Sequence, residues 1–426
     1  MPVRTLAQAA YSSLVWGLQP LLRLKLRRRA LSESGYGQVV EERFGSYLQP
    51  SPPAHELIWI HAVSLGETRA AAVLMHVLRQ QRPDLRFLLT HGTATGRAMG
   101  ATLLHEGDVQ VWQPWDTPAA TRAFLAHFKP RLGVLMETEI WPNLIRSASV
   151  WGVPLVLANA RLSEKSLQRA LQWASLARPA YGALSAVWAQ SEEDAQRLRQ
   201  VGAPVQAVVG NLKFDARPDP AQRALAAQRR VQLHRPLLVL ASSREGEEAL
   251  LLEALAQCPQ PWPFDLLIVP RHPQRFDEVA ALIERRGHRI SRRSAWGPVL
   301  SNWPLEPGSI ALGDSIGEMA LYYGLSSVCL LGGSFLALGG QNLIESAACG
   351  CPVIMGPHTF NFREAADQAL LEGAACRVAD FAGAIQTACE WMQDGSASRR
   401  SDWALSFAQR HRGAAEATAE RLLRIV

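Results

Sequence analysis

The sequence predicts an α/β protein made of two Rossmann-like domains that face each other across a cleft. Short apolar segments alternate with helical segments along most of the chain, which is the pattern of parallel strands joined by helices. The chain has 426 residues, more than one ordinary domain contains. The alternation pauses near residues 210–220 and then resumes, so we expect two domains of this kind.

The composition is that of a globular protein with a modest positive charge. Hydrophobic residues make up 48% of the chain and charged residues 19%, which excludes a disordered chain. The formal net charge of +6 suits an anionic membrane surface, a phosphorylated substrate or nucleic acid. Because no run of aromatic residues is interleaved with Lys and Arg, we expect no nucleic-acid partner.

The six cysteines all lie in the second half of the chain, and none forms a CxxC pair. Most have apolar neighbours, so we interpret them as small core residues of a protein from a reduced compartment. No HExxH or similar spacing is present either, and we expect no metal site.

Residues 1–30 are expected to contact a membrane. The stretch from Thr5 to Leu22 carries no charge, and its length of about 18 residues is near the lower limit for a span. Polar residues and Pro20 weaken the case for a span, and the basic residues that follow argue against a cleaved signal peptide. A spanning segment would leave the remaining chain in the cytoplasm, whereas an interfacial helix would place its arginines on lipid phosphates. The alternative is an ordinary surface helix.

The first Rossmann-like domain is expected over residues 31–215. Its strands are expected at residues 57–63, 86–90, 132–136, 153–158 and 186–190. The first strand is followed by a short loop, Ser64-Leu65-Gly66-Glu67, and then by a helix from Thr68 to Gln81. Ser191, with Asp194 behind it, is expected to cap the helix after the last of these strands.

Glu67 is the candidate catalytic residue of this domain. It stands in a glycine loop at the start of a helix, whose positive end should keep the carboxylate ionised at neutral pH. An ionised carboxylate in a cleft can act as a general base. The simpler interpretation is that Glu67 only suits a helix N-terminus. Glu137 and Glu139 offer a rival base, as do His61 and His91, although buried or capping histidines are commoner.

The second Rossmann-like domain is expected over residues 216–405. A C-terminal helix over residues 406–426 follows and can pack back on the first domain. The strand series begins at Pro236 with LLVLAS, and further strands are expected at residues 264–269, 309–312, 328–331 and 353–355.

Residues 328–362 form the unit around which this domain is organised: a strand, a glycine loop, a helix and a second strand. Two glycine pairs precede Asn342, where the helix begins, and unpaired amides at such a start favour an anion such as phosphate. The alternative needs no ligand. Asn342 and Glu345 then form a capping box, and the glycines only make turns.

Other loops that follow the strands also carry residues that can bind a nucleotide. In open parallel sheets, ligands bind beyond the carboxyl ends of the strands. These loops hold Ser242, Ser243, residues 270–272, residues 316–318, residues 332–334 and residues 342–345. Arg271 would supply a charge-assisted bond to phosphate, and Glu345 would accept hydrogen bonds from ribose hydroxyls. Arg271 alone is better explained by a surface ion pair, but the series of strand ends favours a nucleotide site.

Seven motifs stand out in order along nearly the whole chain. They are WIHAVSLGE (59–67), METEIWPN (136–143), ANARLS (158–163), GNLKFD (210–215), VPRHPQRF (269–276), GDSIGEM (313–319) and GGQNLIESAACGCPVIMGPHTFNF (339–362). Together they resemble the motifs of the Kdo (3-deoxy-D-manno-octulosonic acid) transferases of lipopolysaccharide biosynthesis. Those enzymes resemble glycosyltransferases of the B-type architecture, which has two Rossmann-like domains.

The resemblance implies transfer of Kdo from CMP-Kdo to the lipid A precursor lipid IVA at the cytoplasmic face of the inner membrane. It implies that the first domain binds the acceptor, that the second binds the CMP-sugar, and that Glu67 is the proton acceptor. The residues that would hold CMP are Pro270, Arg271, Ile316, Gly317, Glu318, Asn342, Leu343, Ile344 and Glu345. CMP leaves as a phosphate anion, which needs hydrogen-bond donors and positive charge rather than a general acid. We therefore expect no cofactor or metal, and attack opposite the leaving group would invert the anomeric centre.

Two positions depart from the family pattern, since we expect His where this chain has Gln341 and Arg244. Both side chains still donate hydrogen bonds, so the chemistry is expected to stay intact while the donor preference can differ. Two other functions remain open at this point. One is a nucleotide-sugar epimerase or UDP-sugar transferase of the same architecture, and the other is a non-catalytic protein that binds a membrane surface.

Overall fold

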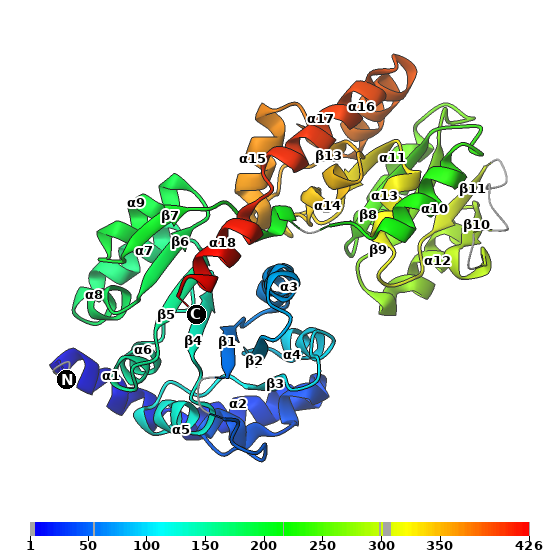
Figure 1. Ribbon diagram of the computed structural model, residues 1–426. Helices are drawn as coiled ribbons and strands as arrows, with labels where there is room; N and C mark the ends of the chain where they lie inside the picture. Colours follow the sequence, from blue (N-terminus) through cyan, green and yellow to red (C-terminus); the bar gives the residue numbers. More distant parts are fainter. Residues whose placement is uncertain (1–4, 54–55, 216, 298–299, 301–307, 426) are drawn as a thin grey trace. The chain divides into compact units, whose positions relative to one another are not determined.

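The computed structural model divides the chain into two compact units, one of residues 1–215 with 412–426 and one of residues 216–411 (Figure 1). The structure describes residues 5–53, 56–215, 217–297, 300 and 308–425. Each unit contains one seven-stranded sheet in which every paired strand is parallel, with helices between the strands. The predicted α/β class with two Rossmann-like domains is confirmed.

In the first unit the strand order is β3-β2-β1-β4-β5-β6-β7. The strands are β1 (Leu57–His61), β2 (Arg86–His91), β3 (Val109–Trp112), β4 (Leu132–Met136), β5 (Leu155–Ala160), β6 (Ala186–Ala189) and β7 (Val205–Val208). The chain runs from β1 to β2 on one side and later to β4 on the other side. The strand order therefore reverses between β1 and β4, and ligands of such sheets bind beyond the strand ends at this point.

Helices bury both sides of this sheet. They are α3 (Leu65–Gln81), α4 (Ala94–Ala101), α5 (Pro118–Phe128), α6 (Pro142–Val150), α7 (Glu164–Gln172), α8 (Ala174–Gly182) and α9 (Glu192–Gln200). Alternate residues of one strand enter different cores, as Trp59 and Ile60 of β1 do. Because both sides are covered, the central strands are continuous apolar runs that sequence patterns detect well. Ser191 caps α9 by accepting a hydrogen bond from Asp194 N at 3.1 Å.

The last helix, α18 (Ala414–Leu423, red in Figure 1), belongs to the first unit. Its alanines share a core with the inner side of α3, including Leu74. The carboxylate of Asp215 accepts hydrogen bonds from Gly413 N at 2.6 Å and Ala415 N at 2.7 Å. These bonds fix the start of α18 beside the residue at which the chain leaves the unit.

The N-terminal segment forms two helices, α1 (Leu6–Gly17) and α2 (Gln19–Ser32), which meet at Leu18 just before Pro20. Among the described residues, no helix combines the length and the apolar character needed to cross a bilayer. The α1 helix packs on α6 and α8, and it buries Ser12 and Val15.

In the second unit the strand order is β10-β11-β9-β8-β12-β13-β14. The strands are β8 (Leu237–Ser243), β9 (Asp265–Pro270), β10 (Arg289–Arg292), β11 (Ser309–Leu312), β12 (Val328–Leu331), β13 (Val353–Met355) and β14 (Ala375–Arg377). The helices are α10 (Pro220–Arg230), α11 (Glu247–Ala256), α12 (Phe276–Arg285), α13 (Met319–Leu325), α14 (Leu343–Ala348), α15 (Arg363–Leu371), α16 (Phe381–Gln393) and α17 (Ser396–Arg410). Here the strand order reverses between β8 and β12, so the loops after these two strands flank the expected ligand position.

The outermost strands of both sheets were not predicted from the sequence; they are β3 and β7 in the first sheet and β10 and β14 in the second. These strands are only three or four residues long. In β7 exposed residues alternate with half-buried ones, and β10 begins and ends with arginine. Short polar edges of this kind discourage pairing with another chain, and they lack the apolar run that marks a central strand.

Candidate active site

Glu67 lies at the switch point of the first sheet, directly after β1. The α3 helix begins at Leu65 rather than at the predicted Thr68, so Glu67 sits in the first helical turn. Ser64 is the N-cap and accepts a hydrogen bond from Glu67 N at 3.3 Å. In return, the Glu67 carboxylate accepts hydrogen bonds from Val63 N at 2.7 Å and from the Ser64 hydroxyl at 3.1 Å. This arrangement is a variant of the capping box in which Val63 rather than the N-cap residue supplies the backbone amide, and it fixes the carboxylate beside the end of β1.

The pKa of Glu67 is raised to about 7, mainly because burial disfavours the charged carboxylate and further because Glu139 and Glu137 lie nearby. The Val63 amide and His61 lower this pKa, but by less. The helix terminus was expected to keep this carboxylate ionised at neutral pH, but Glu67 is only 9% exposed and burial raises its pKa instead. A carboxyl group that titrates near neutral pH is well matched to general-base catalysis.

Glu137 follows β4 directly across the switch point and is bound to two cations. Its backbone has a φ of 55°, a left-handed conformation that a residue with a side chain rarely adopts. Its carboxylate lies 2.8 Å from Arg161 Nε and 3.0 Å from Lys213 Nζ. Because two cations hold it, Glu137 is a poorer candidate for the base than Glu67.

Arg161 and Lys213 are functional candidates that the sequence analysis did not select. Each lies in a motif recognised there, ANARLS and GNLKFD, and each follows an expected strand or the last strand of the domain. The feature of the sequence that could have identified these two residues is that each is a basic residue inside a recognised motif. Their common partner, Glu137, was not predictable from the sequence because three separate loops supply the three residues.

Glu139 and His61 form the other part of this cluster. Glu139 accepts a hydrogen bond from Trp141 Nε1 at 2.8 Å, and its second contact is His61 Nε2 at 3.8 Å. His61 is fully buried, and its Nδ1 lies 2.8 Å from the Thr90 hydroxyl. The Nε2 atom of His61 makes no hydrogen bond within the described part of the chain, so this edge of the ring remains directed at Glu139.

His91 is less suited to the role of base. Its Nδ1 donates a hydrogen bond to the Ala62 carbonyl at 2.9 Å and lies 3.3 Å from the Thr68 hydroxyl. Burial lowers its pKa to about 4, so the imidazole stays neutral at physiological pH. Glu67 combines a pKa near neutrality with a position at the switch point, which makes it the best candidate for the base.

In the second unit, the loops after β8 and β12 approach each other closely at Gly332. A Cβ atom at this position would lie 2.4 Å from the carbonyl oxygen of Ser242, so only glycine fits. Glu247, fully buried at the start of α11, connects the two loops. Its carboxylate accepts hydrogen bonds from Arg244 N at 2.9 Å and from Gly333 N at 2.7 Å. The glycine loop predicted to approach a ligand is therefore held in place by a buried carboxylate.

Pro270 ends β9, and Arg271 follows it at the edge of the sheet, where Arg271 N donates to the Ser243 carbonyl at 3.0 Å. The pKa of His272 is lowered by partial burial and by the positive charges of Arg244, Arg271 and Arg275. Three guanidinium groups therefore lie near one point beyond β8 and β9, and of these Arg275 is paired with Glu248 at 2.8 Å and with Glu278 at 3.2 Å. This positive region favours an anion.

The loop after β11 contains Ile316, Gly317 and Glu318. Ile316 is 77% exposed, and Gly317 has a φ of 81° with open space around its Cα. Glu318 bonds within the unit, because its carboxylate accepts hydrogen bonds from Arg293 at 2.7 Å and from the Ser315 hydroxyl. The backbone of this loop, rather than the Glu318 side chain, is therefore the part available to a ligand.

Asn342 caps α14, since its side-chain oxygen accepts a hydrogen bond from Ile344 N at 3.1 Å. The side chains of Leu343 and Ile344 are buried, so only their backbone can meet a ligand. Glu345 stands in the first turn and is half-buried.

The two departures from the family pattern lie beside one glycine. A Cβ atom on Gly333 would be 3.2 Å from Gln341 Nε2 and 3.6 Å from Arg244 Cγ. Both side chains therefore border the loop that follows β12.

The structure thus places the predicted residues at the strand ends of their own sheets. Glu67 lies with Glu137 and Glu139 in the first unit. The predicted CMP-binding residues follow β9, β11 and β12 in the second unit. Within the described ranges, no three His, Cys, Asp or Glu side chains are grouped so that they could hold a metal ion.

Comparison with known proteins gives matches along the whole chain. Residues 38–216 match the family model described as 3-Deoxy-D-manno-octulosonic-acid transferase (kdotransferase). The 3-deoxy-D-manno-octulosonic acid transferase of Bordetella pertussis is 43% identical, over 98% of this chain and 97% of that protein. The protein of the same name from Haemophilus influenzae is 33% identical, over 91% of each chain. A solved structure of Anabaena Alr3699/HepE in complex with UDP-glucose shares the fold, with a TM-score of 0.54 and 14% identity over 87% of this chain and 100% of that one.

Proposed function

This chain belongs to the 3-deoxy-D-manno-octulosonic acid (Kdo) transferase family, and from that membership we propose a specific reaction. The proposed reaction transfers Kdo from CMP-Kdo to the lipid A precursor lipid IVA, with inversion at the anomeric carbon. The observation that carries the chemistry is the position of Glu67. It is a buried carboxyl group with a pKa of about 7, at the switch point of the first sheet and beside two further glutamates.

In this reaction Glu67 is the general base. A sugar hydroxyl of the acceptor is a weak nucleophile until its proton is removed, and a carboxylate with a pKa near the working pH removes it efficiently. The hydroxyl oxygen then bonds to the anomeric carbon of Kdo while the bond from that carbon to the CMP phosphate oxygen breaks. Attack opposite the leaving group inverts the configuration, and the proton stays on Glu67 until solvent removes it.

The second unit holds CMP and stabilises it as it leaves. Arg271 stands in the positive region beyond β8 and β9, where it offsets the charge that develops on the phosphate. The backbone at Pro270, the loop of Ile316, Gly317 and Glu318, and the start of α14 from Asn342 to Glu345 enclose the nucleotide. Because arginine supplies the positive charge, the proposed transfer needs no divalent metal ion or other cofactor, and its rate is expected to stay unchanged in EDTA.

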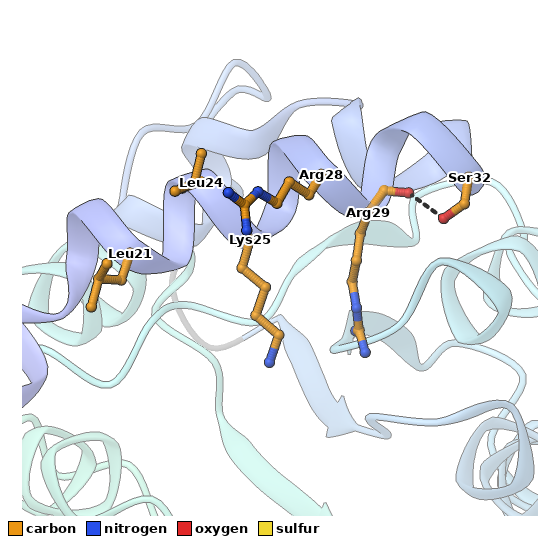
Figure 2. A pocket seen from close by; sticks show the side chains of 6 residues that line it. All are labelled: Leu21, Leu24, Lys25, Arg28, Arg29 and Ser32. Atoms are coloured by element: carbon orange, nitrogen blue, oxygen red, sulfur yellow. Dashed lines mark hydrogen bonds between the residues drawn. The ribbon is translucent and has the colours of Figure 1, made fainter.

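The N-terminal helices hold the protein on an anionic membrane surface, which we place at the cytoplasmic face of the inner membrane. On α1 the exposed side chains include Leu6, Leu14 and Trp16, at 91%, 62% and 67% exposure. A pocket of about 370 Å³ runs along α2 and is lined by Leu21, Leu24, Lys25, Arg28, Arg29 and Ser32. Figure 2 shows Lys25 and Arg29, one turn apart, extending to the same side of α2. Apolar and basic side chains in this combination suit the headgroup region of an anionic bilayer.

The decisive experiment incubates the purified protein with lipid IVA, CMP, CTP, Kdo and a CMP-Kdo synthase, and detects the product by mass spectrometry. We expect a product heavier by at least one Kdo residue. The Glu67→Ala variant should bind CMP with wild-type affinity and lose transfer by a factor of about 100 or more, which is the usual contribution of a general base. Absence of transfer by the wild-type protein would overturn the proposed reaction, and unchanged turnover of Glu67→Ala would overturn the role of Glu67.

A further inference from the structure

The N-terminal helix α1 is bonded directly to the start of α6. The Tyr11 hydroxyl donates a hydrogen bond to Asp116 Oδ2 at 2.8 Å, and the Ser12 hydroxyl lies 2.8 Å from Asn143 Oδ1. At the far end of α1, Trp115 Nε1 donates to the Val15 carbonyl at 3.1 Å. The inner side of this helix therefore makes specific polar contacts with the loop before α5 and with the start of α6, in addition to apolar packing.

Asp116 is the centre of these contacts. It is only 1% exposed, and its carboxylate accepts hydrogen bonds from Asn143 N at 3.1 Å and Leu144 N at 2.8 Å. It thereby satisfies two free amides of the first turn of α6. The ion pairs found among the described residues include none with Asp116, so hydrogen bonds from Tyr11 and these amides are what stabilise its charge. Burial raises its pKa to about 6.

A loop of five residues, 137–141, connects the end of β4 to the first residue of α6. It carries Glu137 and Glu139, the two glutamates that raise the pKa of Glu67. The sheet fixes one end of this loop, and Asp116 with Asn143 fixes the other. A short loop with two fixed ends has few alternative conformations, so a shift of the α6 start must move Glu139.

We propose that α1 is part of the support of the active site, and that Tyr11, acting through Asp116, is a positioning residue for Glu137 and Glu139 and so for Glu67. This inference rests on the proposed function, in which Glu67 is the base. It gives the N-terminal segment a second role beside membrane contact, because removal of α1 would impair transfer even to an acceptor that needs no membrane.

The proposal predicts the direction of a change in the pH profile. Glu139 and Glu137 raise the pKa of Glu67, while His61 and the Val63 amide lower it. Arg161 and Lys213 face Glu137, and His91, which packs against the start of α3, is neutral above about pH 4. Glu139 raises the pKa of Glu67 more than Glu137 does, so when the loop is released and Glu139 moves away, the pKa of Glu67 falls.

The same substitution acts on Asp116 in the opposite direction, which makes the result diagnostic. The Tyr11 hydrogen bond lowers the pKa of Asp116, so its loss raises that pKa. If the loop stayed in place, the acid limb of the profile would move to higher pH or not at all. A shift to lower pH therefore identifies a displaced loop.

The test compares full-length wild type, Tyr11→Phe and Tyr181→Phe, with the lipid acceptor dispersed in detergent so that membrane binding does not limit the rate. Tyr181 is a buried tyrosine of α8, so its variant loses a hydroxyl from the same unit without touching Asp116. For Tyr11→Phe we expect kcat/KM to fall about tenfold, the acid limb to move to lower pH, and CMP affinity to stay unchanged. For Tyr181→Phe we expect an unchanged acid limb. Ser12→Ala removes the contact with Asn143 and should act in the same direction as Tyr11→Phe.

Hydrogen exchange gives a readout that does not depend on activity. In Tyr11→Phe the amides of residues 137–145, and above all those of Asn143 and Leu144, should exchange faster, while α9 and the second unit stay unchanged. Unchanged exchange would overturn the proposal even if the wild-type protein transferred no Kdo, so its failure is distinct from failure of the proposed function. Faster exchange with an unchanged or raised acid limb would overturn it as well.

Discussion

Lys213 Nζ lies 3.0 Å from Glu137 Oε1, although the two residues come from loops that follow different strands of the first sheet. Lys213 belongs to GNLKFD, the segment whose Asp215 also caps α18. The last helix of the chain thereby supports the loop that carries Lys213. The negative cluster of Glu67, Glu137 and Glu139 is balanced in part by this cation.

Replacement of Lys213 by Met should raise the pKa of Glu67. Without the ammonium group, the charge of the buried Glu137 is less compensated and acts more strongly on Glu67. The acid limb of kcat/KM should move to higher pH by about half a unit or more, opposite to the shift expected for Tyr11→Phe. Lys213→Arg, which keeps the charge, is the control, and an acid limb that moves equally in both variants would contradict this account.

The pH dependence of the wild-type enzyme should follow Glu67. In the proposed reaction only the ionised carboxylate of Glu67 accepts the acceptor proton, and its pKa is about 7. We expect kcat/KM to fall tenfold for each pH unit below about pH 6.5 and to level off above about pH 7.5. A measurement from pH 5 to 9 in buffers of constant ionic strength checks this. A rate that stays flat down to pH 5 would exclude Glu67 as the group that titrates.

The same pKa makes Glu67 costly for stability at high pH. The folded state raises the pKa from 4.5 to about 7, so it favours the protonated form. The resulting stabilisation is fully present below pH 4.5 and is lost as the pH rises through 7, a change of about 3 kcal/mol. Glu67→Gln does not titrate, so its stability relative to wild type should increase between pH 5 and pH 8. Urea unfolding at these two pH values measures the difference, and the same difference at both would contradict the raised pKa.

The central strands of both sheets were predictable because parallel strands covered on both sides are continuous apolar runs. For β4, β11, β12 and β13 the predicted and observed bounds coincide. The β5 strand starts at Leu155 instead of residue 153 and extends to Ala160. The sequence contains Asn159 there, a polar residue that is nevertheless fully buried at the strand end. Burial of a polar residue depends on the fold and leaves no local pattern.

The candidate site was predictable in its position but not in its electrostatics. The order of strands and loops places Glu67 at a helix start after the first strand, and the structure agrees with that. Its pKa depends on burial and on Glu139, which comes from another loop, so a local argument from the helix terminus missed the upward shift of this pKa. The contact between Tyr11 and Asp116 joins residues that are distant in the sequence, and nothing in either segment indicates it.

The basic side chains of α2 should control binding to anionic membranes. Lys25 and Arg28 are exposed, and each basic residue near such a surface contributes about 1 kcal/mol. The double substitution Lys25→Glu and Arg28→Glu should lower the partition onto vesicles rich in phosphatidylglycerol at least tenfold. Binding to phosphatidylcholine vesicles should change little. The control is the double substitution Arg285→Glu and Arg289→Glu at two exposed positions of the second unit. An equal loss of vesicle binding in the control would show that net charge, rather than α2, controls binding.

Glu247 should set the affinity for CMP indirectly, because its carboxylate holds backbone amides of two loops. It accepts hydrogen bonds from Arg244 N and Gly333 N through one oxygen and from Phe335 N at 3.2 Å through the other. Glutamine has a single acceptor oxygen, so in Glu247→Gln its amide group must face an N–H donor. The loops after β8 and β12 should then separate, which would displace the backbone that we propose to meet the nucleotide. We expect CMP affinity, measured by calorimetry, to fall about tenfold and the melting temperature to drop.

The matched control is Glu253→Gln, the same chemical change on the exposed side of the same helix. It should leave both quantities unchanged. Glu247 joins the loops after β8 and β12. In Glu247→Gln the loss of CMP affinity should therefore be accompanied by faster hydrogen exchange at the amides of Gly333 and Phe335, which Glu247 binds. A Glu247→Gln variant with a lower melting temperature but wild-type CMP affinity would mean that these loops do not shape the nucleotide site. The assignment of the glycine loop after β12 to donor binding would then be wrong.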